Sequence, residues 1–319
     1  CDDETVTPAD SAQLMKELFL LAELDTEAED LRREMDFSFS FAGVGRFRVN
    51  AYRQRGTLAA VLRSVPFELP DSGKLHIPDS ILSLAENQNG IILVTGAAGS
   101  GKSTTLTCMI DKINSERPGH IVTIEDPIEF LHKHKKSIIS QREIGIDTES
   151  YSDALRAALR QSPNVILLGE MRDNETMSIA MTAAETGQLV LSTLHTVGAA
   201  NTVDRIIDGF PTNQQQQIRM QLSMVLKAVI SQQLLPDTNG TLYPVFEVMV
   251  VNNAIRTMIR ENKTHQIETV MQTTPGMQTM DSAVFKLFSE GIISEETAVE
   301  YASSPAMMSK KIELSRGKQ

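Results

Sequence analysis

The feature that most constrains this chain is an eight-residue run, Gly-Ala-Ala-Gly-Ser-Gly-Lys-Ser, at positions 96–103. It matches the phosphate-binding pattern G-x-x-x-x-G-K-[ST] and lies between an apolar run at 91–94 and a helix-like segment at 104–110. In that setting the backbone N–H groups and the helix N-terminus can face phosphate oxygens. Lys102 can reach the β- and γ-phosphates, and Ser103 can bind Mg²⁺. The sequence therefore predicts a strand, loop and helix that bind ATP; the alternative is a glycine-rich loop without a ligand.

Length and composition bound the class of protein. A chain of 319 residues suits about two domains, and 41% hydrophobic with 22% charged residues is typical of a soluble protein. The net charge of −11 argues against a general nucleic-acid-binding surface, although a local basic groove stays open. No apolar run approaches the roughly 20 residues that span a bilayer. Two cysteines are too few for a disulfide framework or a zinc site, so we expect a reducing cytoplasm.

We expect a small α+β module at 1–68. Residues 9–35 carry leucines at helical spacing, residues 36–52 alternate as strands do, and helix resumes over 57–62. A stretch with two prolines and a glycine overlaps the linker that we place at 69–76. Because the sequence starts with Cys rather than Met, we expect the module to be incomplete at its start.

Strands and helices alternate from residue 77 onward, within a domain that we place at 77–319. This alternation predicts an α/β fold with a mostly parallel sheet covered on both faces. Helical patterns dominate after residue 212, with a short β segment near 241–251 and a helical C-terminal part from about 252. The expected strands are 90–95, 120–124, 164–169 and 188–193, and the helices between them are 102–115, 150–161 and 174–186.

Polar side chains follow three of these strands at their carboxyl ends, where open α/β sheets place ligand-binding groups. Glu125, Asp126 and Glu129 follow the second strand and can position Mg²⁺ or polarise a water. Glu170 ends the third strand as a Walker B carboxylate, with a glycine before it in place of the usual Asp. His195 follows the fourth strand and is a candidate sensor of the γ-phosphate. An acidic loop and a structural histidine are the alternative interpretations.

Phosphoryl transfer also needs a cation that neutralises charge as the γ-phosphoryl group leaves. The larger domain offers few arginines near its strand ends, whereas the N-terminal module offers several. We expect at least two of them to contact the phosphates; the alternative is that they are solvated strand residues. These arginines are Arg46, Arg48, Arg53, Arg55 and Arg63.

Together the motifs resemble those of the secretion ATPases of type IV pilus and type II secretion systems, most closely the PilT-type pilus retraction ATPases. Four motifs follow the family's order and spacing over nearly the whole chain. They are the phosphate loop at 96–103, the Asp box at 123–129, the atypical Walker B motif at 169–173 and the His box at 192–196. The segment 45–51 is similar to the family's N-terminal arginine segment.

A further segment separates the subfamilies. Residues 254–260, Ala-Ile-Arg-Thr-Met-Ile-Arg, with Lys263 and Gln266, are similar to the AIRNLIRE signature of retraction ATPases. Arg256 and Arg260 lie four residues apart and share a helix face. The pilus-assembly relatives usually carry a four-cysteine zinc motif, which two cysteines cannot form. The family's N-terminal acid-serine-aspartate-leucine-histidine stretch is absent from this sequence, which leaves the partner surface of that domain open.

The resemblance implies a RecA-like ATPase core after a PAS-like N-terminal domain, and an ATP hydrolase with Mg²⁺ as cofactor. Glu129 and Glu170 are the carboxylates implied to handle water and Mg²⁺, and His195 is implied near the γ-phosphate. Arg48 and Arg63 match the N-terminal arginines that reach the nucleotide. The implied nucleotide-binding residues are Gly96, Ala97, Ala98, Gly99, Ser100, Gly101, Lys102, Ser103, Thr104, Glu125 and Asp126, with Ser103 and Glu170 as metal ligands.

The leading hypothesis is a homo-hexameric motor that hydrolyses ATP to power type IV pilus disassembly and retraction, and so twitching motility. The resemblance implies a cytoplasmic protein at the inner face of the cytoplasmic membrane. It implies an inner-membrane platform protein as partner, a second retraction ATPase as a further candidate, and neither nucleic acid nor membrane insertion. One alternative is an accessory retraction ATPase, or an assembly ATPase of a related pilus or type II secretion system. A nucleic-acid motor is disfavoured by the acidic charge, and a non-hydrolysing regulator by the two carboxylates, Glu129 and Glu170.

Overall fold

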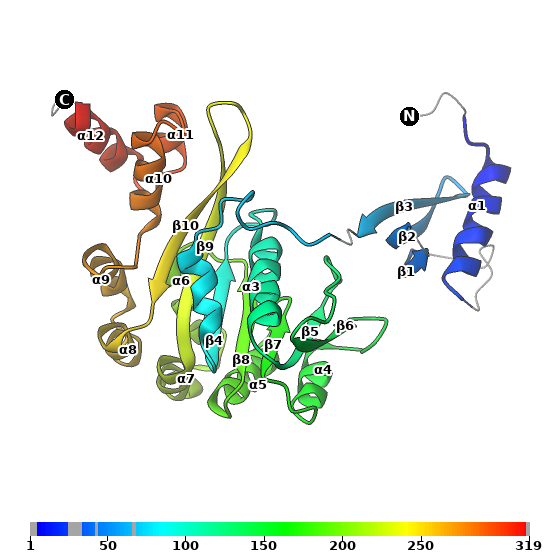
Figure 1. The fold of residues 1–319 in the computed structure, drawn as a ribbon, viewed down its shortest axis with the longest axis horizontal. Coiled ribbons are helices and arrows are strands. Elements are labelled where there is room, and N and C mark those ends of the chain that lie inside the picture. The colour runs from blue at the N-terminus through cyan, green and yellow to red at the C-terminus, as the bar shows by residue number, and fades with distance from the viewer. Residues whose placement is uncertain (1–4, 25–33, 42–43, 66–67, 317–319) are drawn as a thin grey trace. The chain divides into compact units, whose positions relative to one another are not determined.

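The chain forms two compact units in the computed structural model (Figure 1). The first unit ends at Leu69 and the second begins at Pro70, so the division falls inside the linker expected at 69–76. The short segment 129–132 clusters with the first unit. The structure describes residues 5–24, 34–41, 44–65 and 68–316.

The first unit packs one helix, α1 (Pro8–Leu21), on a three-stranded antiparallel sheet. The helix begins with a capping box: Thr7 Oγ1 accepts from the Asp10 N–H at 3.3 Å, and Asp10 Oδ2 accepts from the Thr7 N–H at 2.9 Å. Met15 and Phe19, four residues apart, are buried, and the Phe19 ring meets the Phe37 ring edge-on with centroids 5.3 Å apart. The sheet has the order β1 (Met35–Phe41), β2 (Gly45–Gln54), β3 (Thr57–Val65).

The prediction of a helix at 57–62 is wrong, because these residues belong to strand β3. Arg55 and Gly56 both adopt left-handed backbone angles, φ 50° and 85°, which is the geometry of a tight hairpin turn. The turn sets Thr57 opposite Gln54 and pairs the whole of β3 with β2. Because cross-strand pairing satisfies the backbone groups, it overrides the local helix preference of the Leu-Ala-Ala-Val-Leu run.

The second unit is built on a seven-stranded sheet with the order β10-β9-β4-β8-β7-β5-β6. Neighbouring strands are parallel throughout, except for the antiparallel pair β9–β10 at one edge. The prediction of an α/β fold with a mostly parallel sheet is confirmed. The strands are β4 (Gly90–Thr95), β5 (Gly119–Glu125), β6 (Ser137–Glu143), β7 (Val165–Leu168), β8 (Leu189–Leu194), β9 (Leu226–Pro236) and β10 (Leu242–Val250).

Helices cover both faces of this sheet, and alternate side chains of each central strand enter different cores. Ile91 and Leu93 of β4 pack with the α4–α7 side, whereas Ile92 and Val94 pack with the α2 and α3 side. Burial of one such side chain contributes about 1.5–3 kcal/mol. The covering helices are α2 (Asp79–Leu82), α3 (Lys102–Glu116), α4 (Tyr151–Ala158), α5 (Asn174–Glu185), α6 (Ala199–Asp208) and α7 (Thr212–Val225).

As expected, helices dominate from residue 253 onward. They are α8 (Asn253–Arg260), α9 (Ile267–Thr273), α10 (Met280–Ser289), α11 (Glu295–Glu300) and α12 (Pro305–Arg316). A third apolar core holds helices α10–α12 and the outer part of the β9–β10 pair together, whereas α8 and α9 pack into the core on the α4–α7 side of the sheet.

Two strands of the sheet were missed by the sequence analysis, β6 and β9. Strand β6 is a short edge strand with a half-exposed, polar second half, so its apolar signal is weak. Strand β9 follows α7 without a break at Val225 and Leu226, and no glycine or proline marks the change. An apolar run of this length is compatible with either structure, and only pairing with β4 and β10 decides it.

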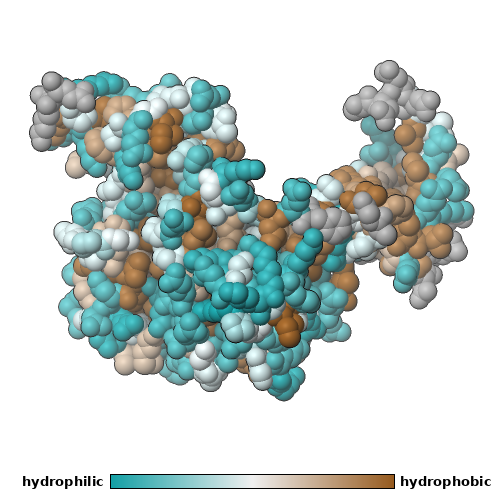
Figure 2. Space-filling view, in the orientation of Figure 1, coloured by the Kyte–Doolittle hydropathy of each residue, from teal (hydrophilic) through white to brown (hydrophobic). Residues whose placement is uncertain are grey.

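The surface of the second unit is mainly polar on the face shown in Figure 2, with small scattered apolar patches. Within the described part of the chain, no helix combines the length and apolar character that crossing a bilayer requires.

Candidate active site

The phosphate loop links the end of β4 at Thr95 to the start of α3 at Lys102. The loop backbone packs tightly on β9. A Cβ atom on Gly96 would lie 2.3 Å from the carbonyl oxygen of Gln232, so no other residue fits at position 96. The Gln232 side chain also accepts from Thr105 Oγ1 of α3 at 2.7 Å. Strand β9, which the sequence analysis missed, therefore fixes both ends of the loop.

Lys102 is almost fully buried, and its ammonium group faces the inside of the loop. Its Nζ donates to the carbonyl oxygens of Gly96 at 3.0 Å and Ala97 at 2.8 Å, and lies 3.4 Å from Nδ1 of His195. An ammonium group only donates, so Nδ1 of His195 is the acceptor in this contact. Lys102 and His195, both predicted as site residues, are therefore in contact.

Glu170 continues this contact chain. Its Oε1 lies 3.4 Å from Nε2 of His195, and its Oε2 accepts from Nε of Arg172 at 2.7 Å. Nη1 of Arg172 in turn lies 4.0 Å from Oδ2 of Asp126. The phosphate loop, His box, Walker B motif and Asp box are therefore connected through Lys102 and these four side chains.

The parallel sheet brings these motifs together, because β5, β7, β8 and β4 are neighbours and their carboxyl ends lie at one edge. Backbone bonds reinforce that edge: the Gly169 N–H donates to the Ile124 carbonyl at 2.8 Å, and Thr193 Oγ1 donates to the Gly169 carbonyl at 2.6 Å. Glu125 is held within the sheet, since it accepts from Thr123 Oγ1 at 2.6 Å and from Gln141 Nε2 at 3.2 Å.

Tyr151, at the start of α4, is a site residue that the sequence analysis missed. A Cβ atom on Gly169 would lie 3.0 Å from its hydroxyl oxygen, so Tyr151 occupies the space into which the usual Walker B aspartate would project. Burial, followed by the nearby Asp126 carboxylate, raises the pKa of Tyr151 and keeps its hydroxyl neutral. No local pattern could have found it, because contact with Gly169 depends on how α4 packs over the sheet.

The rest of the phosphate loop presents backbone and small polar groups. Ser103 and Thr104 are half-buried in the first turn of α3, Ala97 and Ala98 are exposed, and the Ser100 hydroxyl is buried without a partner among the described residues. That buried hydroxyl and the N–H groups at the start of α3 fit a polyphosphate ligand.

The same residues suit Mg²⁺ better than a zinc-like ion. No group of three or more His, Cys, Asp or Glu side chains able to hold a metal occurs in the described part of the chain. Mg²⁺ takes only one or two protein ligands and completes its shell with phosphate oxygens and water. Ser103 and Glu170 are the two ligands that the sequence analysis predicts.

In the first unit, the two predicted arginines are direct partners. Arg48 of β2 lies opposite Arg63 of β3 in the antiparallel register, which places both side chains on one face of the sheet. Arg46, two residues away on β2, donates from Nη2 to Ser38 Oγ at 2.9 Å. Glu129, the last acid of the Asp box, is exposed and belongs to the segment that clusters with this unit.

The two arginines of α8 lie four residues apart on the helix, as expected, but they differ in exposure. Arg260 is exposed and donates to Thr257 Oγ1 at 3.1 Å. Arg256 is half-buried, and its buried Nε has no partner among the described residues. Only Arg260 is therefore fully presented at the surface of the helix.

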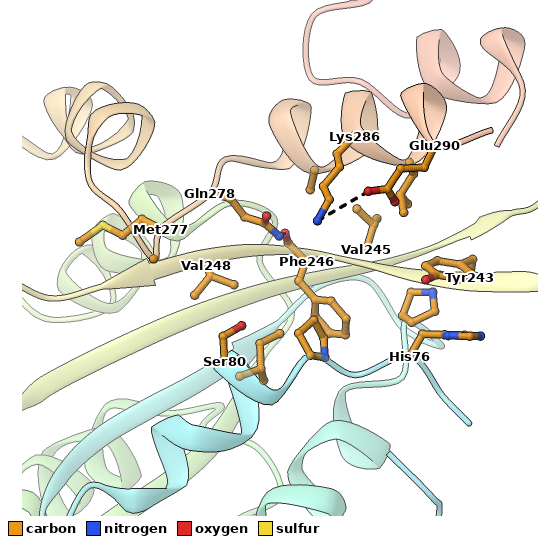
Figure 3. Close-up of a pocket in the computed structure, with 16 residues that line it drawn as sticks. His76, Ser80, Tyr243, Val245, Phe246, Val248, Met277, Gln278, Lys286 and Glu290 are labelled. Atoms are coloured by element: carbon orange, nitrogen blue, oxygen red, sulfur yellow. Dashed lines mark hydrogen bonds and ion pairs between the residues drawn. The ribbon is translucent and has the colours of Figure 1, made fainter. Parts of the chain in front are cut away.

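A cavity of about 390 Å³ lies beside β10 in the larger unit (Figure 3). The rings of His76 and Tyr243 stack at its rim with centroids 4.6 Å apart, and Phe246 forms part of the apolar wall. An ion pair between two α10 side chains lies on the opposite side (Figure 3). Phe246 pairs directly with Gln232 of β9, and Gly96 of the phosphate loop packs on the backbone of Gln232. These groups suit a planar ring with a polar edge.

Known proteins are similar to this chain in sequence. The family model of type II/IV secretion system proteins matches residues 74–242. A twitching motility protein of Neisseria gonorrhoeae is 50% identical over 280 residues, which cover 86% of this chain and 75% of that protein. The type IV pilus retraction ATPase PilT of Pseudomonas aeruginosa is 46% identical over 274 residues, covering 85% of this chain and 80% of that protein. The chain belongs to the PilT-type pilus retraction ATPases of the type II/IV secretion family.

Solved structures agree with this assignment. A crystal structure of the pilus retraction motor PilT with bound ADP is 52% identical to this PilT-type ATPase, with a TM-score of 0.83. The match covers 87% of this chain and 80% of that one. The protein therefore binds nucleotide and is an ATP hydrolase of the pilus retraction type.

Proposed function

We propose that this ATPase acts as a homo-hexameric ring that powers type IV pilus disassembly, with a RecA-like core and a PAS-like N-terminal domain in each subunit. The observation that carries the proposal is the 50% identity to a twitching motility protein over 86% of the chain. The ring works in the cytoplasm, at the inner face of the cytoplasmic membrane. Its partners are a platform protein of that membrane and, as a further candidate, a second retraction ATPase.

In the proposed mechanism, Lys102 moves from the loop carbonyls to the β- and γ-phosphates when ATP binds. Ser103 and Glu170 would hold Mg²⁺, which would supply positive charge against the phosphates. Glu170 and Glu129 orient the attacking water. His195, released from Lys102, lies beside the γ-phosphate region and reports whether the loop is occupied. The contacts of Lys102 and Glu170 with His195 support these roles.

The first unit completes the site in this proposal. Arg48 and Arg63 approach the phosphates and neutralise the charge that develops as the γ-phosphoryl group leaves. Two guanidinium groups opposite one another repel, and an anion between them relieves that repulsion, so their register suits phosphate binding. Closure of this unit over ATP and its opening after hydrolysis would convert chemistry into movement.

We also assign the cavity beside β10 to the base of the bound nucleotide. Two observations support this assignment. Phe246 of the cavity wall pairs with Gln232, on which the phosphate loop packs, and the rings of His76 and Tyr243 stack at the rim.

Three measurements test the proposed function. Purified protein should hydrolyse ATP with Mg²⁺, and its mass in solution should correspond to a hexamer when ATP is present. Deletion of the gene should leave cells with excess surface pili and without surface motility. Normal retraction in the deletion strain, or full activity of a strict monomer, would contradict the proposal.

A further inference from the structure

The environment of Arg172 assigns it a role that the family motifs leave open. It lies two residues beyond Glu170, and its Nε donates to Glu170 Oε2 at 2.7 Å. The Glu170 side chain is largely covered, at 18% exposure, whereas that of Arg172 is 62% exposed. The guanidinium group therefore covers the carboxylate from the solvent side.

The two carboxylate oxygens of Glu170 therefore have different partners. Oε2 is engaged by Arg172, and Oε1 remains directed toward His195 at 3.4 Å. Because Arg172 binds Oε2, the carboxylate group cannot rotate freely, and Oε1 keeps a fixed direction.

Arg172 also offsets a concentration of negative charge. Glu170 and Asp126 end the neighbouring strands β7 and β5, and Arg172 contacts the first and lies 4.0 Å from the second. Without a cation between them, two carboxylates at one sheet edge repel, and each favours rotation away from the other.

The backbone around Arg172 fixes this geometry in advance. The Gly169 N–H donates to the Ile124 carbonyl, and the Met171 N–H donates to the Thr193 carbonyl at 3.3 Å. Met171 is also buried in the core. Because the backbone is fixed at Gly169 and Met171, the guanidinium group of Arg172 can contact Glu170 with little further loss of conformational freedom.

From this geometry we propose that Arg172 is a positioning residue for ATP hydrolysis: it holds Glu170 by Oε2 so that Oε1 faces His195 and the phosphate loop. Its contacts are with carboxylates and not with the loop, so it acts through Glu170. This inference rests on the proposed catalytic role of Glu170, and it names Arg172 as the residue that positions Glu170.

The test is a double-mutant cycle with ATP turnover as the readout. Arg172→Gln should lower kcat about 10- to 100-fold in the wild-type background, within the range for disturbing a positioned catalytic group, and should change KM little. In a Glu170→Gln background, with residual turnover measured by radiolabelled ATP, the same change should have less than about a two-fold effect, because its target is gone. Arg172→Lys, which keeps the charge without the planar fork, should recover part of the loss.

A matched control is Arg156→Gln. Arg156 is also an exposed arginine with a carboxylate partner at 2.7 Å, Glu175, but it lies on the outside of α4. This variant should keep normal turnover. Equal losses for Arg172→Gln with and without Glu170 would overturn the proposal, as would unchanged kcat in the single variant. Absence of turnover in the unmodified protein would instead refute the proposed function itself.

Discussion

Arg48 and Arg63 lie directly opposite each other on neighbouring antiparallel strands of the first unit. Like charges directly opposite each other destabilise a sheet. A fold that keeps two arginines in this register accepts a stability cost, which is understandable if both are needed for an anionic ligand.

We therefore predict opposite effects of Arg63→Ala on stability and activity. The variant should unfold at a slightly higher denaturant concentration, because the repulsion is removed. Its kcat should fall on the order of 10²–10³-fold, the range for loss of one charge-stabilising donor, with a smaller effect on nucleotide binding. Chemical denaturation and steady-state turnover measure both quantities. Arg53→Ala, on the same strand as Arg48, is the control, and similar activity of the two variants would show that Arg63 does not reach the phosphates.

Lys102→Ala and Glu170→Ala should both abolish most ATP turnover, on the order of 10²–10⁴-fold, but by different routes. Lys102 supplies charge to the phosphates before and during the reaction, so its loss should also weaken nucleotide binding. Glu170 acts on water or Mg²⁺, so its variant should still bind ATP. Equilibrium binding of a fluorescent ATP analogue separates the two. Near-normal turnover of Glu170→Ala would remove this residue from the catalytic set and leave Glu129 as the candidate.

Glu247 should make stability depend on pH. This buried residue of β10 accepts from the Ala199 N–H at 2.6 Å and from the Met280 N–H at 3.1 Å, at the starts of α6 and α10. Burial raises its pKa despite these bonds. Its stabilising contribution is therefore full below the ordinary carboxyl pKa and is lost as pH rises through the raised value.

Glu247→Gln cannot ionise, so its stability relative to the unmodified protein should increase from low pH toward neutral pH. A constant loss at every pH is added to this, because the amide nitrogen of Gln cannot accept one of the two N–H bonds. Denaturation curves at several pH values, with the exposed Glu296→Gln as control, measure this difference. If the unmodified protein instead became more stable relative to the Gln variant as pH rises, the two helix starts would be shown to lower the pKa of Glu247.

The cavity beside β10 should affect nucleotide selection. Tyr243→Ala removes half of the stacked ring pair and should raise the KM for ATP while leaving kcat nearly unchanged, because the base is remote from the reacting phosphate. It should also reduce the preference for ATP over other nucleoside triphosphates. Competition assays with GTP and CTP measure that preference. Tyr301→Phe, on α11 and away from the cavity, is the control; an unaltered preference in Tyr243→Ala would place the base elsewhere.

The arginines of α8 should be needed for retraction rather than for hydrolysis. The double change Arg256→Ala and Arg260→Ala should leave ATP turnover within a few-fold of normal while cells accumulate unretracted pili. Because Arg256 is half-buried and Arg260 exposed, the single variant at 260 should retain full stability, and the one at 256 should lose some. Thermal unfolding of both single variants separates the structural effect from the coupling effect. A collapse of turnover at 260 alone would place that residue in the catalytic machinery.

The sequence by itself predicted the parts of this protein whose signals are local. The phosphate loop, the four buried parallel strands and the carboxylates and histidine at their ends follow from short patterns with a fixed spacing. Parallel strands with helical crossovers bring their carboxyl ends to one edge, so the proximity of Lys102, Glu170 and His195 was also predictable in outline.

Only the tertiary structure decided which side chains touch and which ambiguous segments become strands. The 57–62 segment pairs with β2 because a hairpin turn precedes it, and β9 becomes a strand because β4 and β10 flank it. Tyr151 reaches Gly169, and Arg172 lies within 4.0 Å of both Glu170 and Asp126, through packing between residues distant in the chain or on separate strands. Such contacts arise from backbone hydrogen bonding and burial across the whole sheet, and these are long-range energies that no window of the sequence contains.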